Sequence, residues 1–571
     1  MQIIKTLFKL LVFVCPLTSV AQSTYLYEGA KETRFIERIE IKQQKNTNLN
    51  FSSLKPFSRK FIVREAEFLD SARMGYSDST GSDLHREWTD LDLTAVDEYN
   101  LKSLLMNNSE WVTTTRDFNS RKPLWNTFYK TPANLFEVNM PDFFLAVNPV
   151  LQISQSIESG NKERIFLNSR GVNVRGLIGK KVGFSSFITD NQERGPKFFQ
   201  QQVATLRAVP GEGFYKKFKT TGVDYFDARG YITFNAAKFI DFQFGYDKNF
   251  IGNGYRSLFL SDWGNSNLFL KVNTKIWKLN YQNLFMELQP QFTKTSDTLL
   301  DRKYAAMHHL SMNVTKWLNL GLFEGVIFGR RNRFDFQYLN PIIFYRHVEG
   351  TIGSPDNAVA GFEFKANVAH RIQLYGQFLL DEFRLSDIRN NPTSWANKFG
   401  IQLGGKYVDA FGLKNLDLQF ETNRVRPFTY SHNDTTANYT HYNQPLAHPL
   451  GANFQEFIGL MHYQPAPKWN IEGTVIYYYK GLDSASTNYG GNIFKNYVTR
   501  SGENGFNVGS GVKATCVNFF MIVSYEVKQN LFLDLSFQHR NYKLAGVNGE
   551  NNTSLLSAGV RLNMFKRVYN F

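Results

Sequence analysis

The chain has 571 residues, a net charge of +15 at pH 7, a pI near 9.4 and two cysteines. After its N-terminal segment it has no run of about 18 apolar residues, which excludes membrane-spanning helices. The positive charge suits phosphorylated lipid headgroups or an acidic polysaccharide; equally, inward-facing Arg and Lys could pair with Asp and Glu of the same chain. It carries no zinc-finger motif or basic helix, so we expect no nucleic acid partner.

Residues 1–21 have the features of a secretory signal peptide. Basic residues at the start are followed by an apolar run and by the small residues Ser19, Val20 and Ala21. Cleavage after Ala21 leaves Cys516 as the only cysteine. A secreted chain with one cysteine has no internal disulfide and no cysteine metal cluster.

Residues 22–140 show no strand-like alternation. Ser58–Arg73 and Thr94–Trp111 are predicted to be helices, the second with Thr94 as its N-cap. Helices of this size bury little core alone, so we expect them to dock against a larger surface. We predict a periplasmic helical cap or plug for residues 22–140, with a plain linker as the alternative.

Residues 141–571 contain about 18 short alternating segments, and the lengths of their connections follow a rule. Connections after even-numbered segments are tight, whereas those after odd-numbered segments are mostly long. The long ones are residues 190–228, 249–265, 328–359, 424–452 and 480–512. Long loops at one end and short turns at the other are typical of a bacterial outer-membrane barrel.

The alternation itself fits a wall with lipid on one side and a polar lumen on the other. In one segment Leu531, Leu533, Leu535 and Phe537 share a face opposite Asp534, Ser536 and Gln538. In the last segment the lipid face is predicted to be Leu556, Ala558, Val560, Leu562 and Met564. The final aromatic, Phe571, resembles the signal that barrel-insertion machinery reads on a last strand.

The predicted fold class is therefore all-β transmembrane. We expect a closed antiparallel outer-membrane β-barrel of about 18 strands, with a small N-terminal helical periplasmic element. The expected location is the cell outer membrane, and outer-membrane lipid is an expected partner.

The sequence offers no catalytic constellation. His308, His309, His347 and His370 have no serine or acid signature beside them, so ordinary structural histidines are the favoured interpretation. His432, His441 and His448 share one loop, but their spacing fits no recognised metal site. We predict no enzyme, no metal site and no cofactor.

Two long loops carry enough aromatic mass to pack. Arg330, Arg331 and Arg333 precede Tyr338–Gly361, and Asn423–Phe454 is rich in Tyr, Asn, His and Pro. Aromatic faces beside Asn, Gln and Arg donors suit sugar recognition at the outer mouth. An alternative of equal weight to sugar recognition is that these residues only fold the loops inward as a lid over the lumen.

At these loops the chain resembles a known family. The Arg-rich run into YLNPIIFYRHVEG, the GSPDNAVAG after it, and FGYDKNFIGNGYRSLFLSDWGNSN (Phe244–Asn267) resemble the capsule-assembly Wzi-like outer-membrane family, in its Bacteroidetes branch. The resemblance implies an 18-stranded barrel, a helical periplasmic element, a lumen occluded by loops and a non-enzymatic role in holding capsular polysaccharide.

The leading hypothesis is a barrel that binds surface polysaccharide at its extracellular loops. The ligand-binding candidates are Arg330, Arg331, Arg333, Tyr338, Arg346 and Tyr430. The alternatives are a small-solute channel, or an accessory barrel of a gliding-motility or surface-secretion system that binds a periplasmic or secretion-machinery protein.

Overall fold

The computed structural model describes residues 23–27, 29–74, 91, 93–114, 116–292, 299–342, 344–382, 385–547 and 551–571. The expected signal peptide, residues 1–21, and the polar stretch 75–90 lie outside the described residues. Among the helices of the described residues, none is long and apolar enough to cross a membrane.

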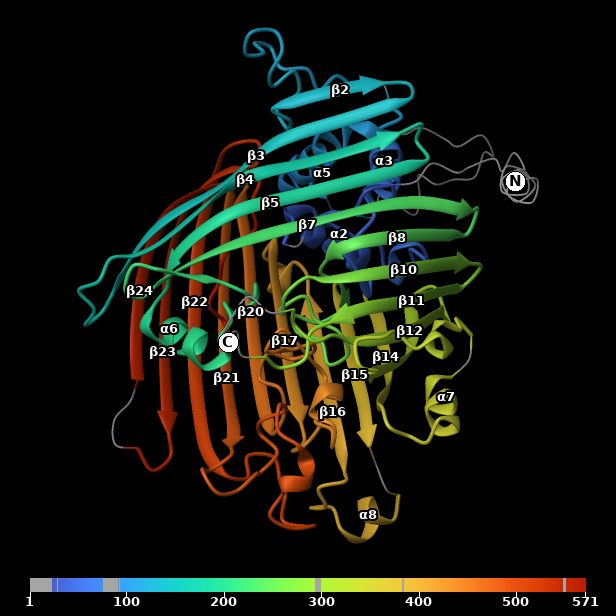
Figure 1. Cartoon of the computed structure of the whole chain (residues 1–571). Coiled ribbons are helices and arrows are strands. Elements are labelled where there is room, and N and C mark those ends of the chain that lie inside the picture. Colours follow the sequence, from blue (N-terminus) through green and yellow to red (C-terminus); the bar gives the residue numbers. More distant parts are fainter. Residues whose placement is uncertain are drawn as a thin grey trace, which may run out of the picture.

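The sheet is a closed antiparallel barrel of 18 strands (Figure 1). The last strand pairs with the first, Leu562 opposite Leu151, so the wall leaves no open edge. The predicted fold class is confirmed. The wall strands are β3 (Phe143–Glu158), β4 (Ile165–Ile178), β5 (Val182–Arg194), β7 (Gly222–Ala237), β8 (Ile240–Asp247), β10 (Asn267–Ile276), β11 (Leu279–Leu288), β12 (Lys303–Asn313), β13 (Leu318–Phe328), β14 (Asn357–Val368), β15 (Ile372–Glu382), β16 (Lys398–Tyr407), β17 (Leu416–Val425), β20 (Phe454–Ala466), β21 (Trp469–Leu482), β22 (Val512–Lys528), β23 (Leu531–Leu544) and β24 (Asn551–Leu562).

Short strands supplement the wall. β2 (Phe136–Met140) pairs with the start of β3, and β6 (Lys216–Phe218) pairs with β7. Two further pairs lie apart from the wall sheet: β1 (Leu54–Lys55) with β9 (Phe250–Ile251), and β18 (Thr440–His441) with β19 (Gln444–Pro445).

The two ends of the barrel differ as the connection lengths predict. At one end, the turn end, strands are joined by short turns such as residues 179–181 and 277–278. At the other, the loop end, the connections are long and contain α6 (Lys197–Leu206), α7 (Tyr345–Thr351) and α8 (Leu385–Asn390). The longest loops are residues 195–221, 248–266, 329–356, 426–453 and 483–511.

The predicted faces of β23 are also confirmed. On β23 the side chains of Leu533, Leu535 and Phe537 are 49%, 54% and 41% exposed on the outer surface. On the inner face of the same strand, Asp534 pairs with Arg561 at 2.9 Å. Apolar residues therefore face outwards and polar residues face the lumen, as lipid on one side requires.

The prediction for the end of the last strand was wrong. β24 ends at Leu562, and residues 563–571 turn into the lumen, where Met564 is 5% exposed against Val150 and Phe187. Phe571 contacts Phe198 and Trp263 there, at ring distances of 6.0 and 6.2 Å. The apolar alternation continues to Met564, past the last paired residue Leu562, so alternation alone does not mark the end of the strand.

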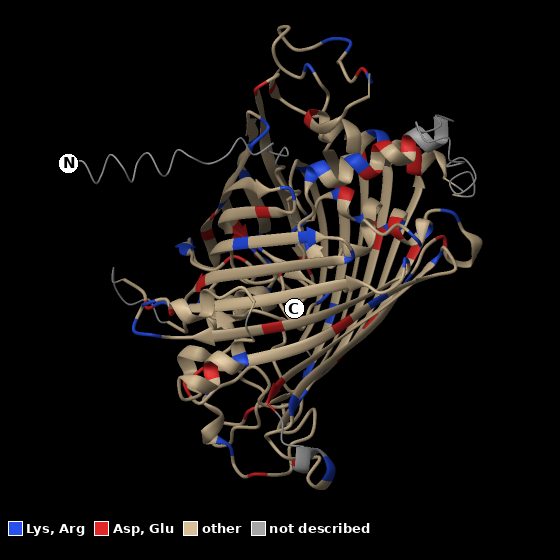
Figure 2. Cartoon of the chain, turned by 90° about the vertical axis from the view of Figure 1, so that its right-hand side faces the viewer, with Lys and Arg blue, Asp and Glu red and all other residues tan. Residues whose placement is uncertain are grey.

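Three helices fill the turn end: α2 (Lys31–Gln43), α3 (Arg59–Met74) and α5 (Ala95–Asn107). They share an apolar core that includes Ile36, Ile62 and Leu104. The predicted Thr94 cap is present, because its hydroxyl accepts the Asp97 N–H at 3.1 Å and Asp97 reciprocates. Figure 2 shows charged residues gathered on these helices and in the loops, whereas long stretches of the wall strands carry none.

Candidate functional site

Part of the lumen is filled by a contact between the two ends of the barrel. The loop 248–266 descends from the loop end, and its β9 pairs with β1 beside the helices of the turn end. The Gly252 N–H donates to Ser53 O at 2.8 Å. Around β9 lies an apolar core that includes Leu258, Phe259, Tyr430 and Tyr439. Side chains from wall and loops thus fill this part of the barrel.

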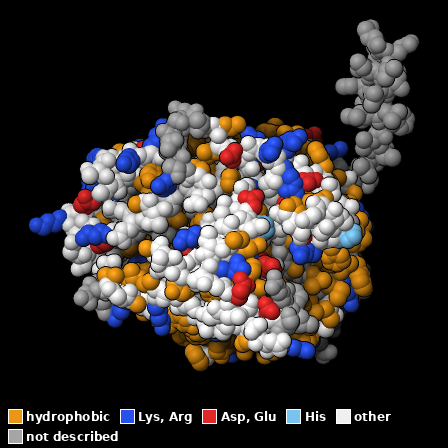
Figure 3. Space-filling model, turned by 60° about the horizontal axis from the view of Figure 1, so that its bottom comes forward, with side chains coloured by type: hydrophobic (Ala, Val, Ile, Leu, Met, Phe, Trp, Pro, Cys, Tyr) orange, Lys and Arg blue, Asp and Glu red, His pale blue; other side chains and the backbone are white. Residues whose placement is uncertain are grey.

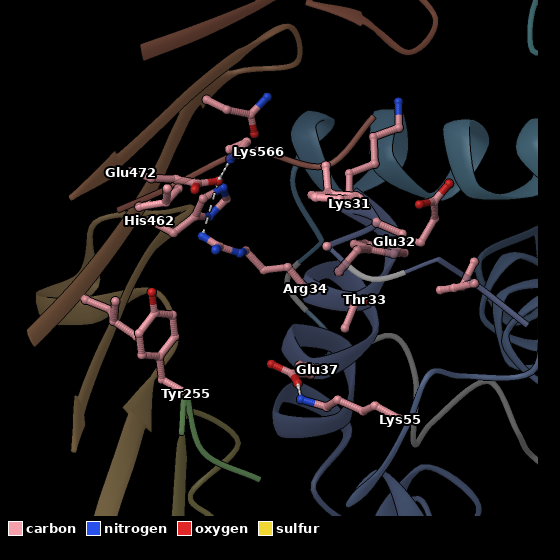
Figure 4. A pocket seen from close by; sticks show the side chains of 18 of the residues that line it. Lys31, Glu32, Thr33, Arg34, Glu37, Lys55, Tyr255, His462, Glu472 and Lys566 are labelled. Atoms are coloured by element: carbon pink, nitrogen blue, oxygen red, sulfur yellow. Dashed lines mark hydrogen bonds and ion pairs between the residues drawn. The ribbon is translucent and has the colours of Figure 1, made fainter. Parts of the chain in front are cut away.

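Between this core, α2 and the strands β17 to β22 there is a cavity of about 570 Å³ (Figure 4). Residues 563–571 line one side of it, and Arg34 reaches into it with 47% of its side chain exposed. Trp263 and Phe571 lie at its border towards the loop end. Charged side chains from α2 and from the wall face this cavity beside apolar ones.

One ion cluster in the cavity joins α2 to the wall and to the final segment. The Glu472 carboxylate on β21 lies 3.6 Å from the Arg34 guanidinium and 2.5 Å from Lys566 Nζ. Figure 4 shows that Arg34 approaches Glu472 from α2, and Lys566 approaches it from the segment that follows β24. Burial lowers the pKa of Lys566, and the negative charge of Glu472 acts in the opposite direction.

A second cluster surrounds Glu37 on the same helix. Its carboxylate is ion-paired with Lys55 of β1 and accepts a hydrogen bond from Lys406 Nζ of the wall at 2.9 Å. Burial by itself would raise the pKa of Glu37. The two ammonium groups outweigh burial and hold this pKa well below its usual range.

A third cluster centres on Arg38, whose side chain is 7% exposed. Its guanidinium donates to Asp97 of α5 at 2.9 Å and to Asp409 in the turn after β16 at 2.6 Å, and it also pairs with Asp417. Burial alone would raise the pKa of Asp97. The charges of Arg38 and Lys42 outweigh burial, and the pKa of Asp97 is lowered below its ordinary value. Three carboxylates from helix and wall therefore converge on one cation, which fixes the helices in the barrel.

His441 and His448 have structural roles, because both are buried and bonded to other parts of the chain. His441 Nδ1 accepts the Gln289 N–H at 3.0 Å, so its Nε2 carries the proton and donates to Ser266 O at 3.0 Å. Burial lowers the pKa of His441 to about 4. His448 pairs with Glu456 at 2.6 Å. The described residues contain no group of three His, Cys, Asp or Glu side chains that could hold a metal ion.

At the loop end, the loops 383–397, 426–453 and 483–511 pack against one another around five aromatic side chains. We call this group the mouth cluster: Trp395, Phe428, Tyr489, Tyr497 and Phe506. Arg500 lies over the Trp395 ring at 3.9 Å, and Lys398 lies over the Tyr497 ring at 3.9 Å. Exposed polar groups surround it, because Lys495 is 42% and Glu503 65% exposed. Figure 3 shows this end of the molecule as a filled surface with scattered cations, and with apolar side chains gathered on its lower and right-hand flanks.

Comparison with known proteins agrees with this architecture. The family model described as capsule assembly protein Wzi matches residues 141–477, more than half of the chain. The chain belongs to the capsule assembly protein Wzi family. This membership and the closed barrel place it in the outer membrane.

Solved structures support the fold of this Wzi-family barrel. Escherichia coli Wzi, described as a carbohydrate-binding β-barrel involved in group 1 capsule assembly, aligns with a TM-score of 0.57 at 13% identity, over 95% of this chain and 100% of that one. Pseudomonas aeruginosa OprD aligns with a TM-score of 0.40 at 11% identity, over 73% and 95% of the chains, too weak a likeness to carry a conclusion. No curated protein sequence matches the chain.

The six residues singled out from the sequence of this Wzi-family barrel do not form one surface. Tyr338 and Tyr430 are 0% and 1% exposed. The Tyr430 hydroxyl donates to Leu258 O at 2.8 Å inside the luminal core. Because both rings are enclosed by protein, they stabilise their loops and offer no face to a ligand.

The four arginines lie in the loop 329–356, which leaves the mouth and folds over the outer wall. Arg330 makes two hydrogen bonds to Asp356, at 2.7 and 2.6 Å, and so closes the base of this loop. Arg331 and Arg333 are exposed, and the Arg346 side chain is 70% exposed. The structure places these arginines over the outer wall and not at the mouth, since a sequence gives the composition of a loop but not the direction in which it folds.

Sequence reasoning did not single out the residues that the structure brings together in the cavity and at the mouth. Tyr497 and Arg500 belong to a loop whose length is its only sequence signal. Arg34, Glu37 and Arg38 lie on α2, which the sequence analysis does not predict. The sequence does contain a signal for an amphipathic helix here, because α2 places charged residues among the apolar Phe35, Ile36 and Ile39.

Proposed function

We propose that this Wzi-family barrel is a non-enzymatic protein that binds surface polysaccharide at its loop end and thereby holds the polymer on the cell. The observation that carries the proposal is that the three loops of the mouth cluster fold into one packed face instead of lining an open entrance. Half-buried Tyr497 and the neighbouring Arg500 and Lys495 give this face an aromatic plane beside hydrogen-bond donors.

Such a face suits a sugar polymer. Sugars offer C–H faces that stack on aromatic rings and hydroxyl edges that accept from fixed donors. The loops are held by contacts among themselves, such as the Trp395 Nε1–H bond to Glu503 at 2.7 Å and the Asn496 bond to Asn433 O at 2.6 Å. A preorganised face loses little conformational entropy when the polymer binds.

The filling of the lumen argues against the small-solute channel. The pairing of β1 with β9 and the apolar core around it occupy part of the path that a solute would take. The relative from Escherichia coli, whose description includes carbohydrate binding, supports the polysaccharide reading.

The test is direct binding of the purified barrel in detergent to surface polysaccharide from its source cells. We expect Tyr497→Ala combined with Lys495→Ala to weaken binding at least tenfold, because the aromatic plane and a donor are lost. The control is Lys181→Ala, which removes an exposed cation from the turn end. Unchanged binding in the mouth variant, with normal gel mobility of the folded barrel, would contradict the proposal.

A further inference from the structure

The loop 329–356 covers part of the wall that lipid would otherwise contact. On β13, Leu322 is 56% exposed on the outer surface, while Phe323 faces the luminal core. Glu324, Val326 and Phe328 share the outward direction of Leu322, since side chains alternate along a strand. Val326 and Phe328 are nevertheless fully buried, because the loop lies over them.

The contacts of the loop with the outer wall are specific. Its Tyr338, Tyr345 and Val348 pack on outward-facing residues of β11, β12 and β13. The Tyr345 ring lies 3.9 Å from the His308 ring, and the Arg346 N–H donates to Glu324 Oε1 at 2.9 Å. Figure 1 shows α7 of this loop on the outside of the barrel, beside β14.

The loop is held in this position by polar bonds as well. Asp356 accepts from Arg330 and, at 2.7 Å, from the buried Tyr338 hydroxyl. The Tyr281 hydroxyl of β11 donates to Pro341 O at 2.5 Å. These bonds tie the two ends of the loop to each other and its middle to β11, so its outer side has a defined composition.

That outer side combines apolar side chains with arginines. Phe336, Ile342 and Phe344 are 79%, 85% and 74% exposed. The acidic Glu349 and Asp356 are buried, whereas Arg331 and Arg333 are exposed and have no ion pair or side-chain hydrogen bond within the described part of the chain. The exposed charge of the loop is therefore positive.

We propose that the loop 329–356 binds the phosphorylated headgroups of lipid in the outer leaflet. Phe336, Ile342 and Phe344 enter the boundary between headgroups and acyl chains, and Arg331 and Arg333 bind the phosphates. The position carries the argument: the loop sits on the lipid-facing wall, directly beyond Leu322, at the end of the barrel that bears the long loops. Exposed aromatic and aliphatic tips beside arginines are the composition of interfacial membrane-binding elements. Guanidinium groups bind phosphate in a bidentate manner, which gives such a site affinity and orientation.

The first experiment measures binding of the full-length barrel in detergent to vesicles of phosphatidylcholine that contain diphosphorylated lipid A. Arg331→Ser combined with Arg333→Ser should weaken binding to these vesicles about tenfold. The matched control is Lys216→Ser combined with Lys217→Ser, which removes the same charge from two exposed lysines at the loop end over another part of the wall. Equal losses in both variants would overturn the proposal, because a general charge effect would then explain the binding.

A second measurement locates the loop without removing any of its contacts. Ile342→Cys, labelled with a polarity-sensitive fluorophore, should shift its emission to shorter wavelength in the lipid A vesicles. Cys516 is 1% exposed and will not compete for the label. Val498→Cys, at a residue that is 59% exposed near the mouth cluster, should keep the emission seen in water. An Ile342 label that stays in water would overturn the proposal, as would a loss of polysaccharide binding without a loss of lipid binding in the arginine variant.

Discussion

At the scale of single residues, the structure depends on charges that are buried only because they have partners. Arg38 is the clearest case, since its guanidinium serves Asp97, Asp409 and Asp417 together. Two of these carboxylates belong to the wall or its turns and one to the helices. The residue therefore stabilises the position of the helices in the barrel more than the barrel itself.

Replacing Arg38 by Ala should release the helices of the turn end. Three carboxylates would lose their common cation, and breaking a buried ion pair from one side costs about 3–5 kcal/mol. We expect trypsin to cleave the helices of this variant in the folded barrel under conditions where the parent chain is resistant. The control is Arg64→Ala, which removes an exposed arginine from α3 and should leave the resistance unchanged. Equal resistance in both variants would show that the Arg38 cluster does not hold the helices.

At the scale of elements, the helices and the wall meet through ion pairs, which makes their contact dependent on pH. The pKa values of Glu37 and Asp97 are lowered in the docked state. A carboxylate with a lowered pKa stabilises the docked state above its ordinary pKa of about 4, and this contribution is lost as the pH falls towards the lowered value.

The helices should therefore loosen in acid before the barrel unfolds. An acid-stable protease, applied to the folded barrel in detergent, should cut the helices at about pH 3 and leave them intact at neutral pH. Gel mobility of the barrel should stay unchanged throughout. Cleavage that rises with increasing pH would contradict this sign and would mean that raised pKa values dominate the contact.

A second contact between elements closes the lumen, and it is open to chemical test. Leu54 of β1 lies opposite Ile251 of β9. The Ile251 N–H donates to Leu260 O at 3.0 Å, away from β1. The pair therefore occupies a non-hydrogen-bonded position, where paired side chains lie closest.

Leu54→Cys combined with Ile251→Cys should form a disulfide under mild oxidation, because opposed residues of such a pair have the Cβ separation that the bond requires. Loss of free thiol and a shift on non-reducing gels measure it. Leu54→Cys combined with Val498→Cys, which reaches the loop end, should remain reduced. Failure of the first pair to cross-link in the folded barrel would contradict the pairing across the lumen.

At the scale of the whole molecule, the barrel is a closed wall whose interior is partly filled from both ends. We predict that the purified chain in planar bilayers shows no steady conductance, because β1, β9 and the apolar core narrow the lumen. The measurement is the current at moderate voltage over many insertions. Frequent stable openings of uniform size would favour a channel and contradict the closed interior.

The sequence predicted the wall well and its contents poorly, for physical reasons. A strand between lipid and lumen must alternate, so Leu533, Leu535 and Phe537 identify their face without any partner. The capping pattern at Thr94 is equally local. Arg38 and Asp409, in contrast, meet across 371 positions of sequence, and no local pattern predicts such a pair. The direction of the loop 329–356 likewise depends on the outer faces of β11 to β13, which form only in the closed barrel.

The most direct test of the central claim is retention of surface polysaccharide by cells that lack this gene. Cell-attached and released polymer are compared in the deletion strain, in a strain complemented with the parent gene, and in one complemented with Tyr497→Ala and Lys495→Ala together. We predict that polymer moves from cells to medium in the deletion strain and in the mouth variant while total synthesis is unchanged. Unchanged retention in the deletion strain would contradict a role in holding polysaccharide on the cell.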